Sequence, residues 1–192
     1  MRLEEAIVER RSIGKVKTDP VDKSLINKLL EAAVWAPNHY HTEPWRFFVM
    51  TGEGRNRLAE AYREIAKEES EAAGTPANEE LLRKQWGKAF RAPVVIAVAA
   101  SPSSLPKVHE IEELAALHAA IQNMLLTAHS LGLGAIWRSG QPLYHTRMKQ
   151  AFGLEEHESM AGLIYVGYPE KEAPASRRTS YTEKTVWLEE QA

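Results

Sequence analysis

The chain has 192 residues, and its 24 Lys and Arg against 26 Asp and Glu give a formal net charge of −2 at pH 7. That balance argues against a general attraction to nucleic acid, and the absence of cysteine excludes disulfides and a thiol nucleophile. The longest apolar window, nine residues over 92–100, is too short to cross a membrane. We therefore expect one globular domain over residues 1–192 in the cytoplasm, with no nucleic-acid or membrane partner.

Helical patterns and short apolar runs alternate along the chain. The spacing of apolar residues predicts helices over 3–9, 20–36, 54–71, 78–90, 110–131 and 143–152. Runs rich in β-branched or aromatic residues predict strands at 46–51, 93–100, 134–138 and 161–168. Two of the runs, 93–100 and 161–168, are apolar on both faces, which is typical of strands covered by helices on both sides.

Two segments stand apart from this regular pattern. The hinge sequence AAGTPAN lies inside residues 68–90, which we expect to form a mobile excursion. The tail 171–192 has no companion pattern, yet it carries the apolar run Thr185–Leu188. We expect that run to cover either this subunit or a partner subunit.

The predicted helix 110–131 carries a face of small residues beside its apolar stripe. The members of that face are Ala115, Ala116, Ala119, Ala120, Asn123 and Thr127. Small side chains let another backbone approach closely, so the face suits a central core helix, a seam between two subunits, or both at once.

Several familiar motifs are absent from the sequence. Thr51–Gly54 and Gly132–Gly134 each lack the third glycine of a dinucleotide fingerprint. There is no phosphate-loop motif, no HExxH zinc motif and no G-x-S-x-G nucleophile elbow. The closest histidine pair, His39 and His41, has no carboxylate pair at ligand spacing. We therefore expect neither a metal site nor a hydrolytic nucleophile.

Three polar clusters remain as candidate sites. Arg10-Arg11-Ser12 follows the first helix, where two cations suit either the helix C-terminus or a bound phosphate. The stiff segment 36–45, APNHYHTEPW, suits either a turn or contacts to a planar heterocycle. Trp137-Arg138-Ser139-Gly140 lies where a predicted strand ends, a common place for sites in sheets flanked by helices.

In this order and spacing, the three clusters resemble the nitroreductase family of FMN-dependent oxidoreductases, and the likeness is closest to its compact members. It runs from ERRSI near the start, through WAPNHYHTEPWRFFV and FRAPVVIAV, to GLGAIWRSG and GLIYVGYP. The resemblance implies an α+β fold, a three-layer sandwich with a central mixed sheet of four to five strands flanked by helices.

The resemblance also implies which residues hold the cofactor. Arg10, Arg11 and Ser12 would hold the FMN phosphate and ribityl chain, and further contacts would come from His39, Trp137, Arg138 and Ser139. Some relatives add an arginine from the C-terminal segment, for which either Arg177 or Arg178 is a candidate. Position 43 is Glu where many members have Gln, so Glu43 either accepts a hydrogen bond from a backbone or flavin N–H or faces away.

By the same resemblance, the chain forms a homodimer with two FMN sites at its interface. Hydride would pass from NAD(P)H to FMN and then to a small acceptor such as a nitroaromatic or a quinone, in ping-pong fashion. No catalytic side chain is then expected, because the cofactor carries the chemistry. The alternatives are a dehydrogenase or an ene or flavin reductase of the same superfamily, and a flavin-binding protein without turnover.

Overall fold

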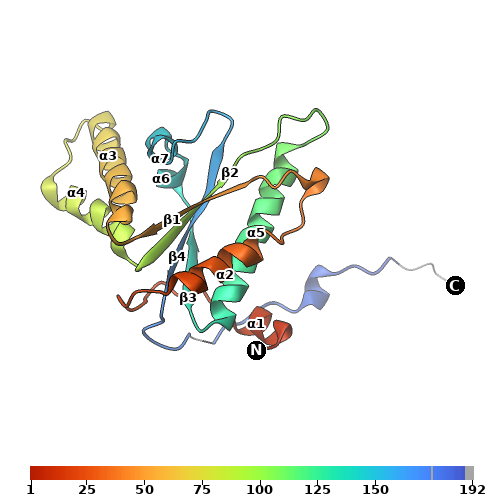
Figure 1. Cartoon of the computed structure of the whole chain (residues 1–192). Coiled ribbons are helices and arrows are strands. Elements are labelled where there is room, and N and C mark those ends of the chain that lie inside the picture. The colour runs from red at the N-terminus through yellow and green to blue at the C-terminus, as the bar shows by residue number, and fades with distance from the viewer. Residues whose placement is uncertain (174, 189–192) are drawn as a thin grey trace.

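Four strands form one sheet at the centre of the structure (Figure 1). In this computed structural model, which describes residues 1–173 and 175–188, the strands lie in the order β1-β2-β4-β3. Their bounds are β1 Trp45–Thr51, β2 Val94–Ala100, β3 Gly134–Arg138 and β4 Ser159–Gly167. All four fall on the apolar runs that predicted them, to within two residues at each end.

The α+β class and the four central strands are confirmed, with one correction to strand direction. The resemblance implies a mixed sheet, but each pair of neighbouring strands runs antiparallel. The parallel component of the described residues is limited to an isolated bridge between Ser12 and Ala135. The segment around Ser12 makes a single pair there, which is too short to count as a further strand.

The two inner strands are buried on both faces, as their sequences predict. Every residue of β2 is buried, and so is every residue of β4 from Met160 to Gly167. Successive side chains of a strand point to opposite faces, so β2 contributes to two cores. Ile96 and Val98 belong to one core, whereas Val95 and Ala97 belong to the other.

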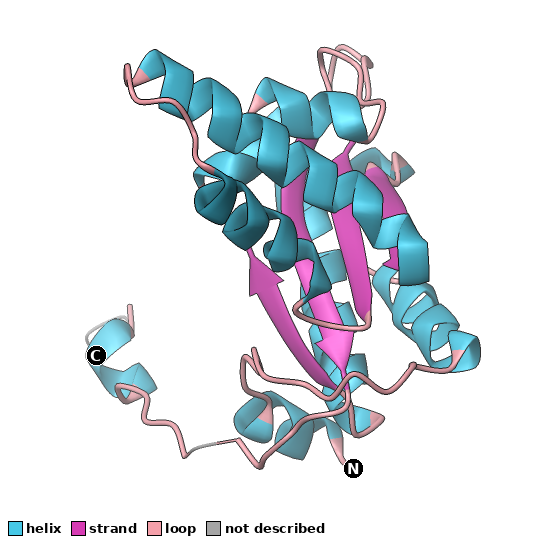
Figure 2. Ribbon diagram, turned by 90° about the vertical axis from the view of Figure 1, so that its left-hand side faces the viewer, coloured by secondary structure: helices cyan, strands magenta, loops and turns pink. Residues whose placement is uncertain are grey.

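Helices cover both faces of the sheet (Figure 2). One face is covered by α2 (Lys23–Ala33) and α5 (Glu110–Ser130). The other face is covered by α3 (Asn56–Ala72), α6 (Gln141–Tyr144) and α7 (Thr146–Ala151), with α4 (Glu79–Trp86) packed on α3. The remaining elements are α1 (Leu3–Glu9) and the 3-10 helices η1 (His39–His41), η2 (Gly52–Arg55), η3 (Gly87–Phe90) and η4 (Tyr181–Lys184).

Two helices differ from the sequence prediction at their ends. Helix α2 begins at Lys23, because the side chain of Asp22 accepts a hydrogen bond from the backbone two residues further on, and it ends at Ala33. The predicted helix 143–152 is two short helices. They are separated by His145, whose extended backbone (φ −73°, ψ 142°) and Nδ1 atom cap α7.

The face of small residues on α5 is divided between the interior and the surface. Ala116 and Ala120 are buried in the core shared with α2, and the amide of Asn123 donates to the carbonyl oxygen of Ala32 on α2 at 3.1 Å. Ala115 is exposed and Ala119 is half-buried. Only the outer part of the predicted seam is therefore open to a second subunit, because α2 occupies the rest.

The C-terminal tail leaves the body of the molecule (Figures 1 and 2). Val186, Trp187 and Leu188 are 81%, 77% and 94% exposed, so this apolar run does not cover its own subunit. The segment 68–90, which we expected to be a mobile excursion, forms the end of α3, a loop, α4 and η3. Residues 174 and 189–192, also part of the predicted tail, lie outside the described residues. Within the described part of the chain, no helix combines the length and the apolar character needed to cross a bilayer.

An ion pair between a partly exposed arginine and a buried glutamate joins β1 to the residue before β4. The Nη1 atom of Arg46 donates to both carboxylate oxygens of Glu158, at 2.8 and 2.6 Å, and the backbone N–H of Glu155 donates to Glu158 as well. Burial would raise the pKa of Glu158. The hydrogen bonds from Arg46, Glu155 and Ser101 outweigh that effect and lower the pKa to about 2, from an ordinary value of 4.5.

We predict that Glu158→Gln destabilises the fold by up to roughly 3 kcal/mol at neutral pH, because the native state binds the ionised carboxylate preferentially. Since the folded-state pKa is depressed, this contribution is complete above about pH 4.5 and is lost as the pH falls to about 2. Urea unfolding of wild type and variant between pH 7 and pH 2 measures the difference. If the difference in free energy of unfolding between wild type and variant stays constant across this pH range, the pKa of Glu158 is not lowered by these contacts.

Candidate active site

The first and third polar clusters lie side by side in the structure. Ser12 forms its parallel bridge with Ala135 of β3, and the backbone N–H of Ile13 donates to the carbonyl oxygen of Ala135 at 2.9 Å. β3 is an edge strand, so its outer side is free to take this pairing. The folded chain thus joins residues 10–12 to the strand that carries residues 137 and 138.

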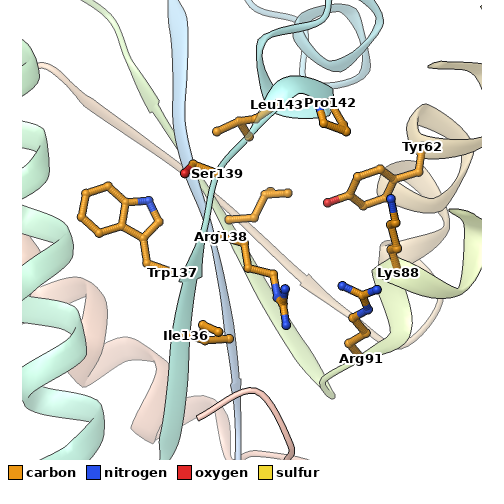
Figure 3. A pocket seen from close by; sticks show the side chains of 10 residues that line it. Tyr62, Lys88, Arg91, Ile136, Trp137, Arg138, Ser139, Pro142 and Leu143 are labelled. Atoms are coloured by element: carbon orange, nitrogen blue, oxygen red, sulfur yellow. The ribbon is translucent and has the colours of Figure 1, made fainter. Parts of the chain in front are cut away.

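Side chains of β3 alternate between the two faces of the sheet. Ile136 and Arg138 point toward α3 and η3, whereas the indole of Trp137 points the opposite way, toward α5 (Figure 3). The indole Nε1 donates to the carbonyl oxygen of Ala161 at 3.1 Å, and the ring centroid lies 5.3 Å from that of His118. The side chains of Trp137 and Arg138 therefore lie on opposite faces of the sheet.

The indole of Trp137 requires a glycine beneath it. A Cβ atom added to Gly162 on β4 would lie 2.2 Å from Nε1 of Trp137, which is closer than real Cβ contacts allow. Gly162 thus lets the indole lie directly against the neighbouring strand. This packing sets the position of β3 and of Arg138 on it.

A cavity of about 400 Å³ opens on the Arg138 side of β3 (Figure 3). Its walls come from α3, η3, the turn before β2, the end of β3, α6 and β4. The lining residues are Tyr62, Lys88, Arg91, Ile136, Trp137, Arg138, Ser139, Pro142, Leu143 and Leu163. None of these described lining residues is acidic, so three cations face the cavity without a carboxylate.

A second cavity of about 610 Å³ adjoins the first, because Arg91 and Arg138 line both. It is also lined by residues 14–16 and by Glu170. Together the two cavities form one cleft that runs from the segment after Ser12 to the end of β3. We call it the cationic cleft, after its residues Lys15, Lys88, Arg91 and Arg138.

The cations of the cleft are only partly compensated. Burial, assisted by the charge of Arg91, lowers the pKa of Lys88. The Nε atom of Arg138 is buried without a hydrogen-bond partner in the described part of the structure. Its guanidinium lies 5.6 Å from the ring centroid of Tyr165, a weak compensation for the lost solvent. Such an arrangement favours an anionic or electron-rich ligand.

A second group of cations surrounds Arg10. Partial burial lowers the pKa of Arg10, and the neighbouring guanidinium groups of Arg11 and Arg178 lower it further. Arg178 is one of the two C-terminal arginines that the sequence leaves open, and its effect on Arg10 is the weakest of these causes. Positive charges that lie near one another favour a bound anion.

Arg11 serves partly in the local structure. Its Nη1 atom donates to the carbonyl oxygens of Val8, at 2.6 Å, and of Arg10, at 2.9 Å. It therefore caps the C-terminus of α1, as the structural alternative in the sequence allows. Its Nε atom is buried and has no partner among the described residues, so part of its hydrogen-bonding capacity remains available.

Two tyrosines lie on the cleft side of the sheet. The hydroxyl groups of Tyr62 and Tyr165 are 3.4 Å apart and buried. Burial raises the pKa of Tyr62, and burial together with Tyr62 raises the pKa of Tyr165. Both hydroxyls are therefore protonated at neutral pH, and Tyr62 lines the cleft as an uncharged polar group.

His39 lies away from the other predicted site residues. Its Nδ1 atom is 2.8 Å from Oε2 of Glu112, in the first turn of α5. His39 is thus held on the face of the sheet that α5 covers, whereas the cleft opens on the opposite face. His39 is not among the described residues that line the cleft of its own subunit. Glu43 is also exposed at this end of the molecule.

Sequence reasoning missed several residues of the cleft, including the polar residues Lys15, Tyr62, Lys88 and Arg91. Lys88 and Arg91 lie in and just after η3, in a region that reads as an ordinary charged surface helix. The sequence did contain one signal, because Arg91 comes directly before the buried strand β2. The side of the sheet on which Arg91 lies is decided by tertiary packing, which the sequence does not show.

Comparison with known proteins agrees with this architecture. The family model described as "Nitroreductase family" matches residues 7–168. The Bacillus subtilis protein named "Putative NAD(P)H nitroreductase YfhC" is 34% identical over 92% of this chain and 89% of its own. A protein from Escherichia coli K12, "Putative NAD(P)H nitroreductase YdjA", is 31% identical over 90% of this chain and 91% of its own.

Among solved structures, a nitroreductase-like family protein from Bacillus cereus superposes with a TM-score of 0.83 at 32% identity, covering 98% of this chain and 97% of its own. A nitroreductase-type structure from Desulfovibrio desulfuricans, solved in complex with FMN, superposes with a TM-score of 0.73 at 27% identity and covers 98% of each chain. The fold is the one that these nitroreductase-like structures share. The chain belongs to the nitroreductase family.

Proposed function

We propose that this protein is an FMN-dependent oxidoreductase that takes hydride from NAD(P)H and reduces a small acceptor such as a nitroaromatic or a quinone. The observation that carries the proposal is the cationic cleft, which lies beside the Arg10–Ser12 segment. Bound FMN would supply the redox chemistry, alternately accepting and donating hydride. The protein supplies binding, electrostatics and access.

The residues present fit FMN at both of its polar ends. Its phosphate is a dianion, which suits the group of Arg10, Arg11 and Arg178 with the exposed hydroxyl of Ser12. Its pyrimidine ring carries carbonyl and nitrogen acceptors, which suit the cations Lys88, Arg91 and Arg138. In this proposal the cofactor also meets residues 137–139 along the end of β3.

A homodimer completes the site in this proposal. The resemblance assigns His39 a flavin contact, yet His39 lies on the α5 face of the sheet and does not line the cleft of its own subunit. A second subunit packed along the exposed face of α5 can supply it. The exposed apolar run Val186–Leu188 also needs a partner to cover it.

Two other activities remain compatible with the same cleft. One is a dehydrogenase, or an ene or flavin reductase, that acts on a specific metabolite, and the other is flavin binding without turnover. The acceptor distinguishes the first from a nitroreductase, and reduction by a nicotinamide distinguishes the second. We place the enzyme in the cytoplasm, where NADH and NADPH are supplied.

We predict that the purified protein is yellow and releases FMN, not FAD, when it is denatured. The group around Arg10 offers one site for a phosphate beside the cleft, and the sequence has no dinucleotide fingerprint for a second one. Anaerobic NADH or NADPH should bleach the flavin within seconds, as followed by its absorbance. Flavin that stays oxidised with both donors would favour a carrier, and FAD as the sole flavin would contradict the assignment.

We also predict that Arg10→Ala weakens FMN binding by about tenfold to a hundredfold, because it removes a charge-assisted partner of the phosphate. Riboflavin lacks the phosphate, so its affinity should change little and the gap between the two ligands should narrow. Titrations of apo-protein with each flavin measure both constants. Arg2→Ala is the matched control, since Arg2 is an exposed arginine at the other end of α1. If the difference between the FMN and riboflavin affinities stays unchanged, Arg10 does not contact the phosphate.

For the dimer, we predict that Ala115→Glu weakens association and lowers FMN content. Ala115 is exposed in the single subunit, so the added charge should be harmless to the fold but costly inside an interface, by several kcal/mol. Sedimentation and the ratio of flavin to protein test this. Ala72→Glu, at an exposed alanine of α3, controls for added charge alone. A stable, yellow Ala115→Glu dimer would place the interface elsewhere.

A further inference from the structure

The loop that contains His39 has a strained backbone. Tyr40, His41 and Glu43 have φ values of 58°, 53° and 49°. These values lie in the left-handed region that residues with a side chain rarely adopt. Strain of this kind persists only where surrounding contacts hold it, and it often marks a functional segment.

Glu113 on α5 provides the contacts that hold this loop. Its side chain is 0% exposed. One carboxylate oxygen, Oε1, accepts a hydrogen bond from the hydroxyl of Thr42 at 2.6 Å. The other, Oε2, accepts from the backbone N–H of Ser103 at 3.1 Å. A single buried carboxylate thus ties the loop 38–44 to the segment 101–109, which follows β2.

The same two segments enclose a small apolar pocket. Its volume is about 240 Å³, and it is lined by Tyr40 on one side and by residues 105–108 on the other. The ring of Tyr40 stacks on that of His39 with centroids 4.0 Å apart and an interplanar angle of 12°. His39 is itself held by Glu112. The wall formed by Tyr40 is therefore linked to α5 through His39 and Glu112.

The size and chemistry of the pocket suit one aromatic ring. An apolar cavity of about 150 Å³ is known to bind benzene, so this pocket has room for a ring with one substituent. Tyr40 offers its face for stacking. Lys107 lines the pocket through its apolar stem, which leaves the ammonium group at the rim for a negatively polarised substituent.

We propose that Glu113 is a positioning residue for the electron acceptor. By joining the two segments it sets the width of the pocket between Tyr40 and residues 105–108, which binds the aromatic ring of an acceptor that carries a nitro or carboxylate group. This proposal rests on the proposed function and its dimer. In that dimer Tyr40 lies beside His39, on the loop that we propose meets the flavin of the partner subunit, so the pocket serves that flavin.

The test compares Thr42→Val with Thr42→Ser. Valine has nearly the shape of threonine but cannot donate to Glu113, whereas serine keeps the hydroxyl. With 4-nitrobenzoate as acceptor, we expect Thr42→Val to raise KM about tenfold and Thr42→Ser to stay within about twofold of wild type. With ferricyanide, which needs no aromatic pocket, both variants should stay within about twofold. Equal KM changes for the two acceptors, or no change for either, would overturn the proposal.

Further measurements distinguish a failure of the pocket proposal from a failure of the proposed FMN-dependent function. If Thr42→Val does not fold, Tyr40→Gly removes one wall and relieves the left-handed backbone, with Tyr40→Phe as its matched control. The same KM difference between acceptors is expected for that pair. Failure of the proposed function would show as absent FMN or absent reduction by NAD(P)H. Calorimetric titration with 4-nitrobenzoate tests the pocket in either case, and equal affinities of Thr42→Val and Thr42→Ser would overturn it.

Discussion

Burial of β2 and β4 on both faces places the strongest constraint on this molecule, because it decides where polar chemistry can be located. The two inner strands fill two cores and contribute only Leu163 of β4 to the lining of the cleft. The polar side chains of the cleft therefore come from the edge strand β3 and from the helices and loops around the sheet. The cationic cleft forms where β3 ends and where η3 and the segment after Ser12 approach it.

The cleft gathers more positive charge than its own carboxylates compensate. Lys88 and Arg10 have lowered pKa values, chiefly because they are partly buried and secondly because other cations lie near. A ligand that brings negative charge compensates the cations for their partial burial and also reduces the repulsion between them. Occupancy and folding are therefore coupled, because any ligand that binds only the native state stabilises it in proportion to its affinity and concentration. The fold tolerates the repulsion between these cations because helices pack on both faces of the sheet.

Sequence periodicity was sufficient for the strands and for most helices, since apolar runs and caps are local signals. It placed the start of α2 too early, because Asp19-Pro20 and Asp22 are both plausible caps and only the folded backbone selects Asp22. The family resemblance assigned Arg10, Ser12, Arg138 and Ser139 to one site. Their contacts with a flavin stay a prediction. Lys88 and Arg91 were missed because charged residues near helix ends look alike until packing assigns them a face.

The placement of the His39 loop has a consequence for mixtures of chains. The cleft opens on the face of the sheet opposite α5, and the His39 loop is bound to the first turn of α5. In the proposed dimer, each site therefore draws its two parts from different polypeptides. When a chain defective only in the cleft pairs with a chain defective only in the loop, both defects fall on one site and the other site is intact. Two inactive proteins can then restore activity by exchanging partners, with half the sites of each mixed dimer working.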